Sequence, residues 1–278
     1  MTNSAYDALA PHYRDYARTR AAYCDSVDRR LTEWLPARVD AMLDVGAGDG
    51  HRAVRLASAF GAARLVLADP SRPMVDLCRA HIANLSAPDS SNSRDSRDSS
   101  VDPVDPVDVT KSRSRAAYQP PRRIEIWNCE AEALPVPSER FDVITCLWNV
   151  LGAVDSTARR LEALRRMAAL LAPGGRLYLD VHNRYNVSTA GLWSVMGRLV
   201  IDAVRPTETN GVVRFTWRVA GQQIRSHGYL FTRRELIGLV AAAGLRMTRE
   251  VFVDYADGRT RGPWTGQMLV CLEHADER

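Results

Sequence analysis

The chain has 278 residues, and 46% of them are hydrophobic. This is enough apolar material for the core of one large α/β domain, or of one domain with a small cap. The formal net charge of +4, with a pI of about 8.9, is too weak to indicate nucleic-acid binding by itself.

Cysteine and histidine usage argues against two further classes. The five cysteines are widely spaced and contain no C-x-x-C pair, which indicates neither a disulfide framework nor a zinc site. The six histidines show no metal-ligand spacing, so we expect no metal.

No apolar run approaches the roughly 18 residues of a membrane span, and no signal-peptide pattern is evident. We therefore expect a reduced, cytoplasmic protein.

The first ninety residues alternate between helix and strand patterns. Residues 1–40 have the amphipathic pattern of helices. A short apolar strand over residues 41–45 runs into a glycine-rich turn, and a helix over residues 51–60 follows. A second strand over residues 64–68 ends at an acidic residue, and another helix over residues 72–85 comes next. Strand, turn, helix and strand form a βαβ unit, which predicts a parallel sheet.

Residues 89–115 interrupt this alternation. They contain eight serines and six aspartates and almost no bulky apolar group, so they cannot bury a core. We expect a disordered surface insert within the domain. It does not mark a domain boundary, because the α/β pattern resumes afterwards.

Five more strands and two helices are predicted beyond the insert, the second helix being opened by a capping box of Thr232 and Glu235. In chain order these are strands 123–128 and 141–147, helix 156–171, strand 176–181, helix 232–244, and strands 247–253 and 267–273. The whole pattern predicts an α/β fold with a doubly wound, mostly parallel seven-stranded sheet that carries helices on both faces.

The glycine-rich turn is the strongest chemical signal. Gly46, Gly48 and Gly50 directly follow a buried strand, where glycine lets the backbone turn sharply and approach a ligand closely. Asp69 ends the next strand, 23 residues beyond Gly46, where a carboxylate can accept hydrogen bonds from ribose hydroxyls. The dinucleotide fingerprint G-x-G-x-x-G requires glycine where this chain has His51. The turn therefore favours S-adenosylmethionine (SAM), which has no pyrophosphate to bind, over a nicotinamide cofactor.

Four motifs, taken in order, resemble those of class I SAM-dependent methyltransferases. The resemblance is strong over residues 40–180 and loose at the two ends. The motifs are Leu43–Gly50, Ala68–Ser71, Cys129–Pro135 and Leu171–Gly175.

This resemblance implies a SAM-binding role for particular residues. Those implied are Asp44, Gly46, Ala47, Gly48 and Leu147 at the methionine part of SAM, Asp69 at its ribose, and Pro70, Met74, Glu130 and Ala131 at its adenine. The resemblance also implies that residues 1–40 form a helical lid, with Tyr6 and Tyr13 closing over the cofactor. The SAM-binding domain would then comprise residues 41–278, with a substrate cap over residues 183–230.

Ligands of this architecture bind beyond the carboxyl ends of the strands. The residues expected there at the acceptor are Trp148, Asn149, Asn183, Arg184 and Tyr185. His182 is the preferred general base, because imidazole titrates near neutral pH. A structural histidine is the alternative interpretation of this residue.

The leading hypothesis is a SAM-dependent methyltransferase that moves the methyl group by in-line displacement to an O or N atom of a small-molecule acceptor. An RNA or tRNA methyltransferase is a less favoured alternative, based on the basic pI and on a mild resemblance of Tyr6–Arg20 to a tRNA wobble-modifying subgroup. A non-catalytic SAM-fold scaffold is a third hypothesis, and a nicotinamide oxidoreductase is a weaker fourth. The sequence predicts no oligomeric state.

Overall fold

The structure is a computed structural model that describes residues 4–86 and 119–276. The predicted insert over residues 89–115 lies outside the described residues. Within the described part of the chain, no helix is long and apolar enough to cross a membrane.

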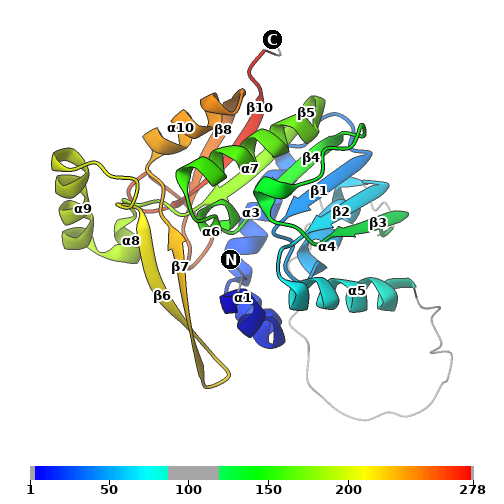
Figure 1. Ribbon diagram of the computed structural model, residues 1–278, viewed down its shortest axis with the longest axis horizontal. Helices are drawn as coiled ribbons and strands as arrows, with labels where there is room; N and C mark the ends of the chain where they lie inside the picture. Colours follow the sequence, from blue (N-terminus) through cyan, green and yellow to red (C-terminus); the bar gives the residue numbers. More distant parts are fainter. Residues whose placement is uncertain (1–3, 87–118, 277–278) are drawn as a thin grey trace.

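A mixed sheet runs through the centre of the molecule (Figure 1). Among the described residues it has eight strands in the order β3-β2-β1-β4-β5-β10-β8-β9. The strands from β3 to β5 in this order are parallel, whereas β10 runs antiparallel to both β5 and β8. Their bounds are β1 Ala41–Val45, β2 Arg64–Ala68, β3 Arg123–Trp127, β4 Phe141–Cys146, β5 Leu171–Val181, β8 Leu245–Val253, β9 Thr260–Arg261 and β10 Gln267–His274. The mostly parallel α/β sheet is confirmed, and the two-residue β9 adds an edge to the seven predicted strands.

Helices cover both faces of this sheet (Figure 1). One core cluster joins the sheet to α7 and α10, and a second joins its other face to α3 and α4. The helix bounds are α1 Ser4–Leu9, η1 Ala10–His12, α2 Tyr13–Arg18, α3 Ala21–Glu33, α4 His51–Phe60, α5 Arg72–Ser86, η3 Ala131–Ala133, α6 Val150–Ala153, α7 Thr157–Leu170, α8 Val187–Ala190, α9 Leu192–Val204 and α10 Arg233–Ala242.

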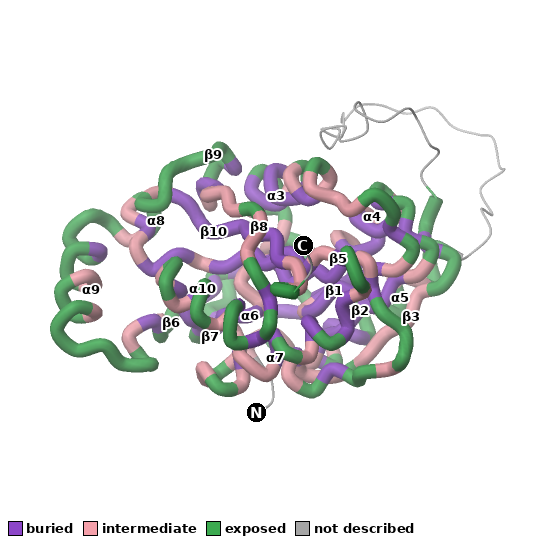
Figure 2. Tube along the Cα trace, turned by 90° about the horizontal axis from the view of Figure 1, so that it is seen from above, coloured by how far each residue is buried: buried purple, intermediate pink, exposed green. Residues whose placement is uncertain are grey.

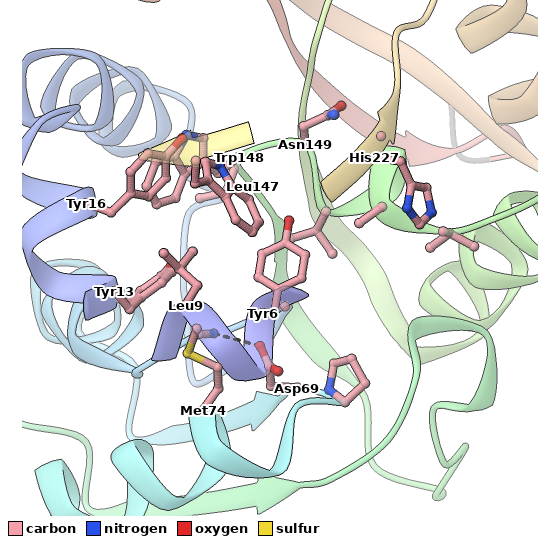
Figure 3. A pocket seen from close by; sticks show the side chains of 18 of the residues that line it. Tyr6, Leu9, Tyr13, Tyr16, Asp69, Met74, Leu147, Trp148, Asn149 and His227 are labelled. Atoms are coloured by element: carbon pink, nitrogen blue, oxygen red, sulfur yellow. Dashed lines mark hydrogen bonds between the residues drawn. The ribbon is translucent and has the colours of Figure 1, made fainter. Parts of the chain in front are cut away.

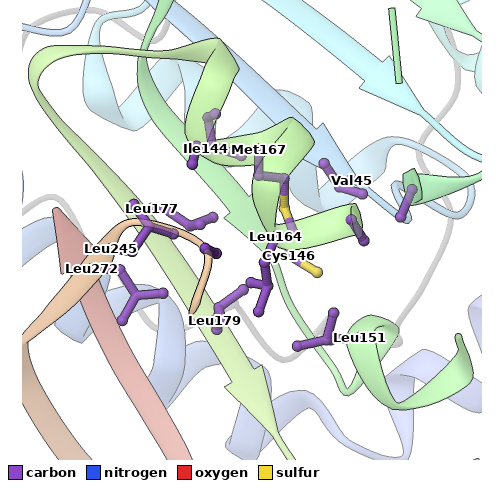
Figure 4. Close-up of a cluster of buried hydrophobic side chains, with 14 of the residues drawn as sticks. Val45, Ile144, Cys146, Leu151, Leu164, Met167, Leu177, Leu179, Leu245 and Leu272 are labelled. Atoms are coloured by element: carbon purple, nitrogen blue, oxygen red, sulfur yellow. The ribbon is translucent and has the colours of Figure 1, made fainter. Parts of the chain in front are cut away.

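The side-chain alternation of the strands explains the two cores. In β1, Met42 packs on the face of α3 and α4, and its neighbour Leu43 packs on the face of α7. Successive residues of a strand point to opposite faces, so a strand covered on both sides is apolar throughout. Figure 4 shows Leu164 of α7 lying among the β-strand side chains of the first core. Burial is continuous through the central strands and is lost towards α9 at one end (Figure 2).

The boundary between α7 and β5 differs from the prediction. Ser156 caps α7 by accepting a hydrogen bond from the N–H of Arg159, and the helix ends at Leu170. Strand β5 begins at Leu171, five residues earlier than predicted, because the Pro-Gly-Gly segment remains in the strand across an irregularity in its pairing with β4.

Residues 183–230, the predicted cap, contain α8, α9 and a hairpin. Among the residues that the structure describes, the hairpin strands β6 Val212–Val219 and β7 Gln222–Tyr229 pair only with each other, and they extend past the main sheet (Figure 1). Helix α1 contacts both β7 and α5. The first N-terminal helices, α1 and α2, thus lie across the carboxyl ends of the central strands, between the hairpin and α5.

Replacement of Leu164 by alanine tests the core under α7. Leu164 is fully buried, so Leu164→Ala should lower the free energy of unfolding by about 2–5 kcal/mol, through lost burial and a residual cavity. Denaturant unfolding measures this change. Leu192→Ala is the control, because Leu192 is 55% exposed and its truncation should cost less than about 0.5 kcal/mol. Equal effects of the two variants would contradict the assigned core.

Candidate active site

A cavity of about 1000 Å³ lies at the carboxyl ends of the central strands. One part is lined by the glycine-rich turn, the end of β2 and the segment before η3. The opposite part is lined by the β6–β7 hairpin, and α1 and α2 contribute the tyrosines between them (Figure 3). One continuous space therefore connects the sequence motifs with the predicted cap.

Two glycines of the turn are required by both backbone and space. Gly46 has a φ of +74°, and a Cβ there would lie 2.3 Å from Cγ2 of Val150. Gly48 has a φ of +58°, and its Cβ would lie 2.6 Å from the hydroxyl oxygen of Tyr13. Any larger residue would strain the backbone and collide with the cavity wall. Both glycines line the cavity.

Asp69 lies at the end of β2, and the residue is only 8% exposed. Its Oδ2 accepts a hydrogen bond from the N–H of Gly48, and its Oδ1 accepts one from the N–H of Ser71, both at 2.9 Å. Burial raises the pKa of Asp69 to about 7, while the two hydrogen bonds oppose this rise. The carboxylate is thus held rigidly at the cavity wall, with lone pairs left for a ligand.

Several other predicted cofactor residues line the same part of the cavity. They are Pro70, Met74, Glu130, Ala131 and Leu147. Burial raises the pKa of Glu130 as well. Cys129, which begins the third motif but was given no predicted role, lines the wall beside them.

Asp44 and Ala47 do not line the cavity. The Oδ1 atom of Asp44 accepts a 2.5 Å hydrogen bond from the hydroxyl of Thr145 on the neighbouring strand, and burial raises the pKa of Asp44 to about 6. Ala47 is 7% exposed and packs in the core with α4. The structure thus places both residues behind the cavity wall, where they support the glycine-rich turn.

Tyr6 and Tyr13 line the cavity from the N-terminal helices (Figure 3). The ring of Tyr6 packs edge-on against Trp217 of β6, with centroids 5.1 Å apart. The ring of Tyr16 stacks on Trp148 at 5.4 Å. These ring contacts join the N-terminal helices to both the hairpin and the β4 loop. The helices are also tied to the β2 loop, because Ser71 donates a 2.6 Å hydrogen bond to Asp7.

Trp148 and Asn149, which follow β4, both have a φ of 60°. Such left-handed backbone is uncommon for residues other than glycine and concentrates at functional sites. Both residues line the cavity. The amide of Asn149 is engaged within the protein, since its Oδ1 accepts the N–H of His182 (3.0 Å) and its Nδ2 donates to the carbonyl of Tyr229 (3.3 Å).

The structure corrects the placement of Asn183, Arg184 and Tyr185, which do not line the cavity. Arg184 is 2% exposed and forms ion pairs with Asp202 of α9 (3.1 Å) and Glu235 of α10 (2.7 Å). Asn183, Arg184 and Tyr185 instead line a separate pocket beyond the end of β5.

Local contacts explain this correction. The chain after β5 pairs with the segment beyond the hairpin through a bridge between Asn183 and Phe231. The Asn183 amide donates to the carbonyls of Pro263 and Gly266, and the Tyr185 hydroxyl donates to Asp202. These residues anchor the cap to the sheet.

Two histidines line the cavity. Burial, with the positive charge of Arg20, lowers the pKa of His182 to about 4, so this predicted base is neutral near pH 7 and binds a proton only weakly. His227 of β7 was not among the predicted site residues. Its Nε2 lies 3.0 Å from Oδ1 of Asp155, and its side chain is 60% exposed.

The hairpin, which lies within the predicted cap, and the end of β8 contribute further residues to which the sequence analysis gave no individual role. Phe215 and Trp217 of β6 and Tyr255 after β8 line the cavity. Large apolar residues occupy every second position from Val213 to Val219, and this alternation was a signal for a strand with one buried face. No local pattern indicated that this face would meet the cofactor motifs.

Comparison with known proteins identifies the family. A family model described as a methyltransferase domain matches residues 13–250. No curated protein sequence matched the chain.

Solved structures share the fold at low sequence identity. The CcbJ methyltransferase from Streptomyces caelestis has a TM-score of 0.60 and 14% identity, with 90% of each chain covered. A SAM-dependent methyltransferase from Methanosarcina mazei has a TM-score of 0.57 and 16% identity, covering 88% of this chain and 96% of that one. SAM-bound CalS10, an amino pentose methyltransferase from Micromonospora echinaspora, has a TM-score of 0.53 and 16% identity, covering 95% and 96%. The chain has the fold of these solved methyltransferases and belongs to the methyltransferase-domain family.

Proposed function

We propose that the protein methylates an N or O atom of a small molecule that binds in the cavity beside SAM. The observation that carries this proposal is the extent of the cavity, which runs without interruption from Asp69 to the β6–β7 hairpin and holds about 1000 Å³. Pockets for one drug-sized ligand span about 300–1,000 Å³, so there is room for the cofactor and a compact acceptor.

The residues at the β1–β2 end of the cavity fit SAM. Gly46 and Gly48 allow the methionine part to approach the backbone, and Asp69 accepts hydrogen bonds from the ribose hydroxyls. Pro70 and Met74, which line the cavity, would contact the adenine. When bound, SAM supplies a methyl group on a sulfonium sulfur, already activated for displacement.

The other predicted cofactor residues have proposed roles at the adenine, at the ammonium group and in covering the cofactor. Glu130 and the N–H of Ala131 would hydrogen-bond to the adenine, and the Leu147 carbonyl would accept from the ammonium group; all three residues line the cavity. Asp44, placed behind the wall, acts on the ammonium through the glycine-rich turn or through water. Tyr6 and Tyr13 cover the cofactor and exclude water.

The acceptor half has mainly aromatic walls. Phe215 and Trp217 line it from β6, Tyr16 lines it from α2 and Trp148 from the β4 loop. Aromatic faces bind apolar rings and cationic amines, and their rigidity helps to hold an acceptor in one orientation. Orientation alone can contribute about 7–11 kcal/mol to a displacement reaction. The structural neighbours support this acceptor class, since two are described as an amino pentose methyltransferase and a glycopeptide N-methyltransferase.

His227 is the residue that we propose takes the proton lost by the acceptor. It lines the acceptor half, and the hydrogen bond with Asp155 fixes the orientation of its ring. In Figure 3 its ring lies across the cavity from Tyr13 and Tyr16. His182 is a weaker candidate for this role, because its lowered pKa of about 4 reduces its basicity.

A panel of acceptors tests the proposed function. Purified protein with methyl-labelled SAM should methylate members of a panel of amino sugars, aromatic amines and phenols, and should leave bulk tRNA unlabelled. Labelling of tRNA that falls steeply with salt would instead support the RNA alternative. Absence of SAM binding in calorimetry would favour the scaffold hypothesis.

The raised pKa of Asp69 predicts a pH-dependent affinity for S-adenosylhomocysteine (SAH), the demethylated product. Below a pH of about 7 the carboxyl group is protonated and accepts ribose hydrogen bonds less well. The SAH dissociation constant should therefore fall about tenfold between pH 6 and pH 8. The variant Asp69→Asn should bind at least tenfold more weakly at pH 8 and show a flat profile. A similar slope in both proteins would refute the ribose contact.

The variant His227→Gln tests the proton acceptor. It removes the basic ring nitrogen, so turnover should fall by about 10²–10⁴-fold while SAH affinity stays within twofold. Steady-state kinetics with the best acceptor of the panel gives the comparison. His274→Gln is the matched control, because His274 lies on β10 beside the carbonyl of Leu171 and does not line the cavity. Undiminished turnover in His227→Gln would exclude the role.

A further inference from the structure

Helix α9 turns its charged side chains towards the protein and its apolar side chains towards solvent. Arg198 donates a 2.9 Å hydrogen bond to the carbonyl of Arg184. Asp202 accepts hydrogen bonds from the guanidinium of Arg184 (3.1 Å) and from the hydroxyl of Tyr185 (2.7 Å). These two are the only charged residues of α9, and both are bound inward. A surface helix normally buries its apolar side instead.

The outward side of α9 is a continuous apolar surface, which we call the α9 face. Trp193 is 86% exposed and Val204 is 79% exposed, and the other members have about half of their surface in solvent. Positions 193, 196, 200 and 204 follow one another at intervals of three and four, so they share one side of the helix. The face lies at one end of the molecule, where burial is lost (Figure 2). Its members are Leu192, Trp193, Met196, Val200, Ile201 and Val204.

The α9 face has the size of one side of a protein interface. The exposed fractions of its six side chains correspond to about 700 Å² of accessible surface, against ~800 Å² from each partner of a standard interface. The largest apolar patch on a typical monomer is about 300–600 Å². A face of this size therefore indicates a partner that covers it.

Two possible occupants fit the α9 face poorly. A helix that binds a lipid surface carries Lys or Arg along an exposed polar side, whereas the single arginine of α9, Arg198, is bound to Arg184. The chain between α5 and β3 begins and ends at the opposite end of the molecule from α9 (Figures 1 and 2), and its residues 89–115 contain almost no bulky apolar group. The partner must itself offer an apolar, uncharged surface.

The α9 face is such a surface and is complementary to itself. When two copies of α9 run antiparallel and cross at their middle, Trp193 meets the partner's Val204 and Gly197 meets the partner's Val200. A Cβ added at Gly197 would find no heavy atom within 4 Å, so the backbone is open there and a second helix can approach closely. Each of these contacts occurs twice, as a twofold interface requires.

We propose that the protein is a homodimer whose two copies pair through antiparallel α9 helices. The pair buries about 1,400 Å², within the range of about 1,200–2,000 Å² for specific, stable interfaces. Leu192 lies at the rim, where contacts add little energy. The inference does not depend on the proposed function, because the residues of α9 lie outside the cavity. Substitutions on the α9 face therefore change association and leave SAH binding as it is.

Sedimentation equilibrium tests the dimer with the full-length protein at micromolar concentration. Wild-type protein should have twice the chain mass of 30.9 kDa. The variant Gly197→Glu should raise the dimer dissociation constant at least a hundredfold, because two like charges would be buried together in the interface. The fold of each copy should tolerate the change, since a Cβ at Gly197 meets no neighbour.

Gly238→Glu is the matched control. Gly238 lies on α10, and a Cβ there also meets no heavy atom within 4 Å. This variant should dimerise as the wild-type protein does. Circular dichroism shows whether each variant is folded, and SAH affinity should agree within twofold among all of them. A monomeric wild-type protein would overturn the proposal, and so would a dimer that Gly197→Glu leaves intact.

A charge exchange shows whether the partner is a second copy. Gly197→Lys should be monomeric by itself, as Gly197→Glu is. An equimolar mixture of the two variants should recover the dimer, because opposite charges then meet across the twofold axis. A mixture that sediments as monomer would overturn the antiparallel pairing. Wild-type monomer that cosediments with phosphatidylglycerol vesicles would instead make α9 a lipid-binding helix.

Discussion

The buried carboxylate of Asp180 joins the three segments on which the cavity depends. Its Oδ1 accepts a hydrogen bond from the hydroxyl of Tyr23 on α3, and its Oδ2 accepts one from the N–H of Trp148 after β4. Its main-chain oxygen accepts the N–H of Asn149 (2.8 Å). The left-handed backbone of Trp148 and Asn149 costs on the order of 1–3 kcal/mol for each residue, and these bonds offset that cost. Without Asp180, Trp148 and Asn149 would lose the hydrogen bonds that fix their backbone at the cavity wall.

The N-terminal helices depend on the same buried network. Burial raises the pKa of Asp180, whereas the Tyr23 hydrogen bond and the charge of Arg52 oppose the rise. Arg52 of α4 also donates to Asp28 of α3 at 2.9 and 2.7 Å. Buried ion pairs contribute little net stability but strongly disfavour arrangements that leave one partner unpaired. Helix α3 is therefore held in one register on the sheet, and the preceding segment delivers its tyrosines and Arg20 to the cavity.

The two halves of the site differ in how far the sequence could predict them. Gly46, Gly48 and Asp69 follow directly from strands, so a local pattern located them on one edge of the sheet. Arg184 was misplaced because the direction of a side chain after a strand depends on its partners. Those partners, Asp202 and Glu235, lie 18 and 51 residues further along the chain. His227 and Tyr255 reach the cavity only through the packing of the hairpin and the end of β8, and no local pattern encodes that packing.

This difference has a physical basis that bears on acceptor choice. The cofactor half is built from backbone at positive φ and from strand ends, where few residues fit. The acceptor half is built largely from side chains on short helices and on a two-stranded hairpin that forms a sheet separate from the main one. Substitutions of partly exposed residues there, such as Phe215, change the shape of the cavity with little effect on the main core. A chain can therefore keep the fold of its structural neighbours at 14–16% identity and still bind a different acceptor.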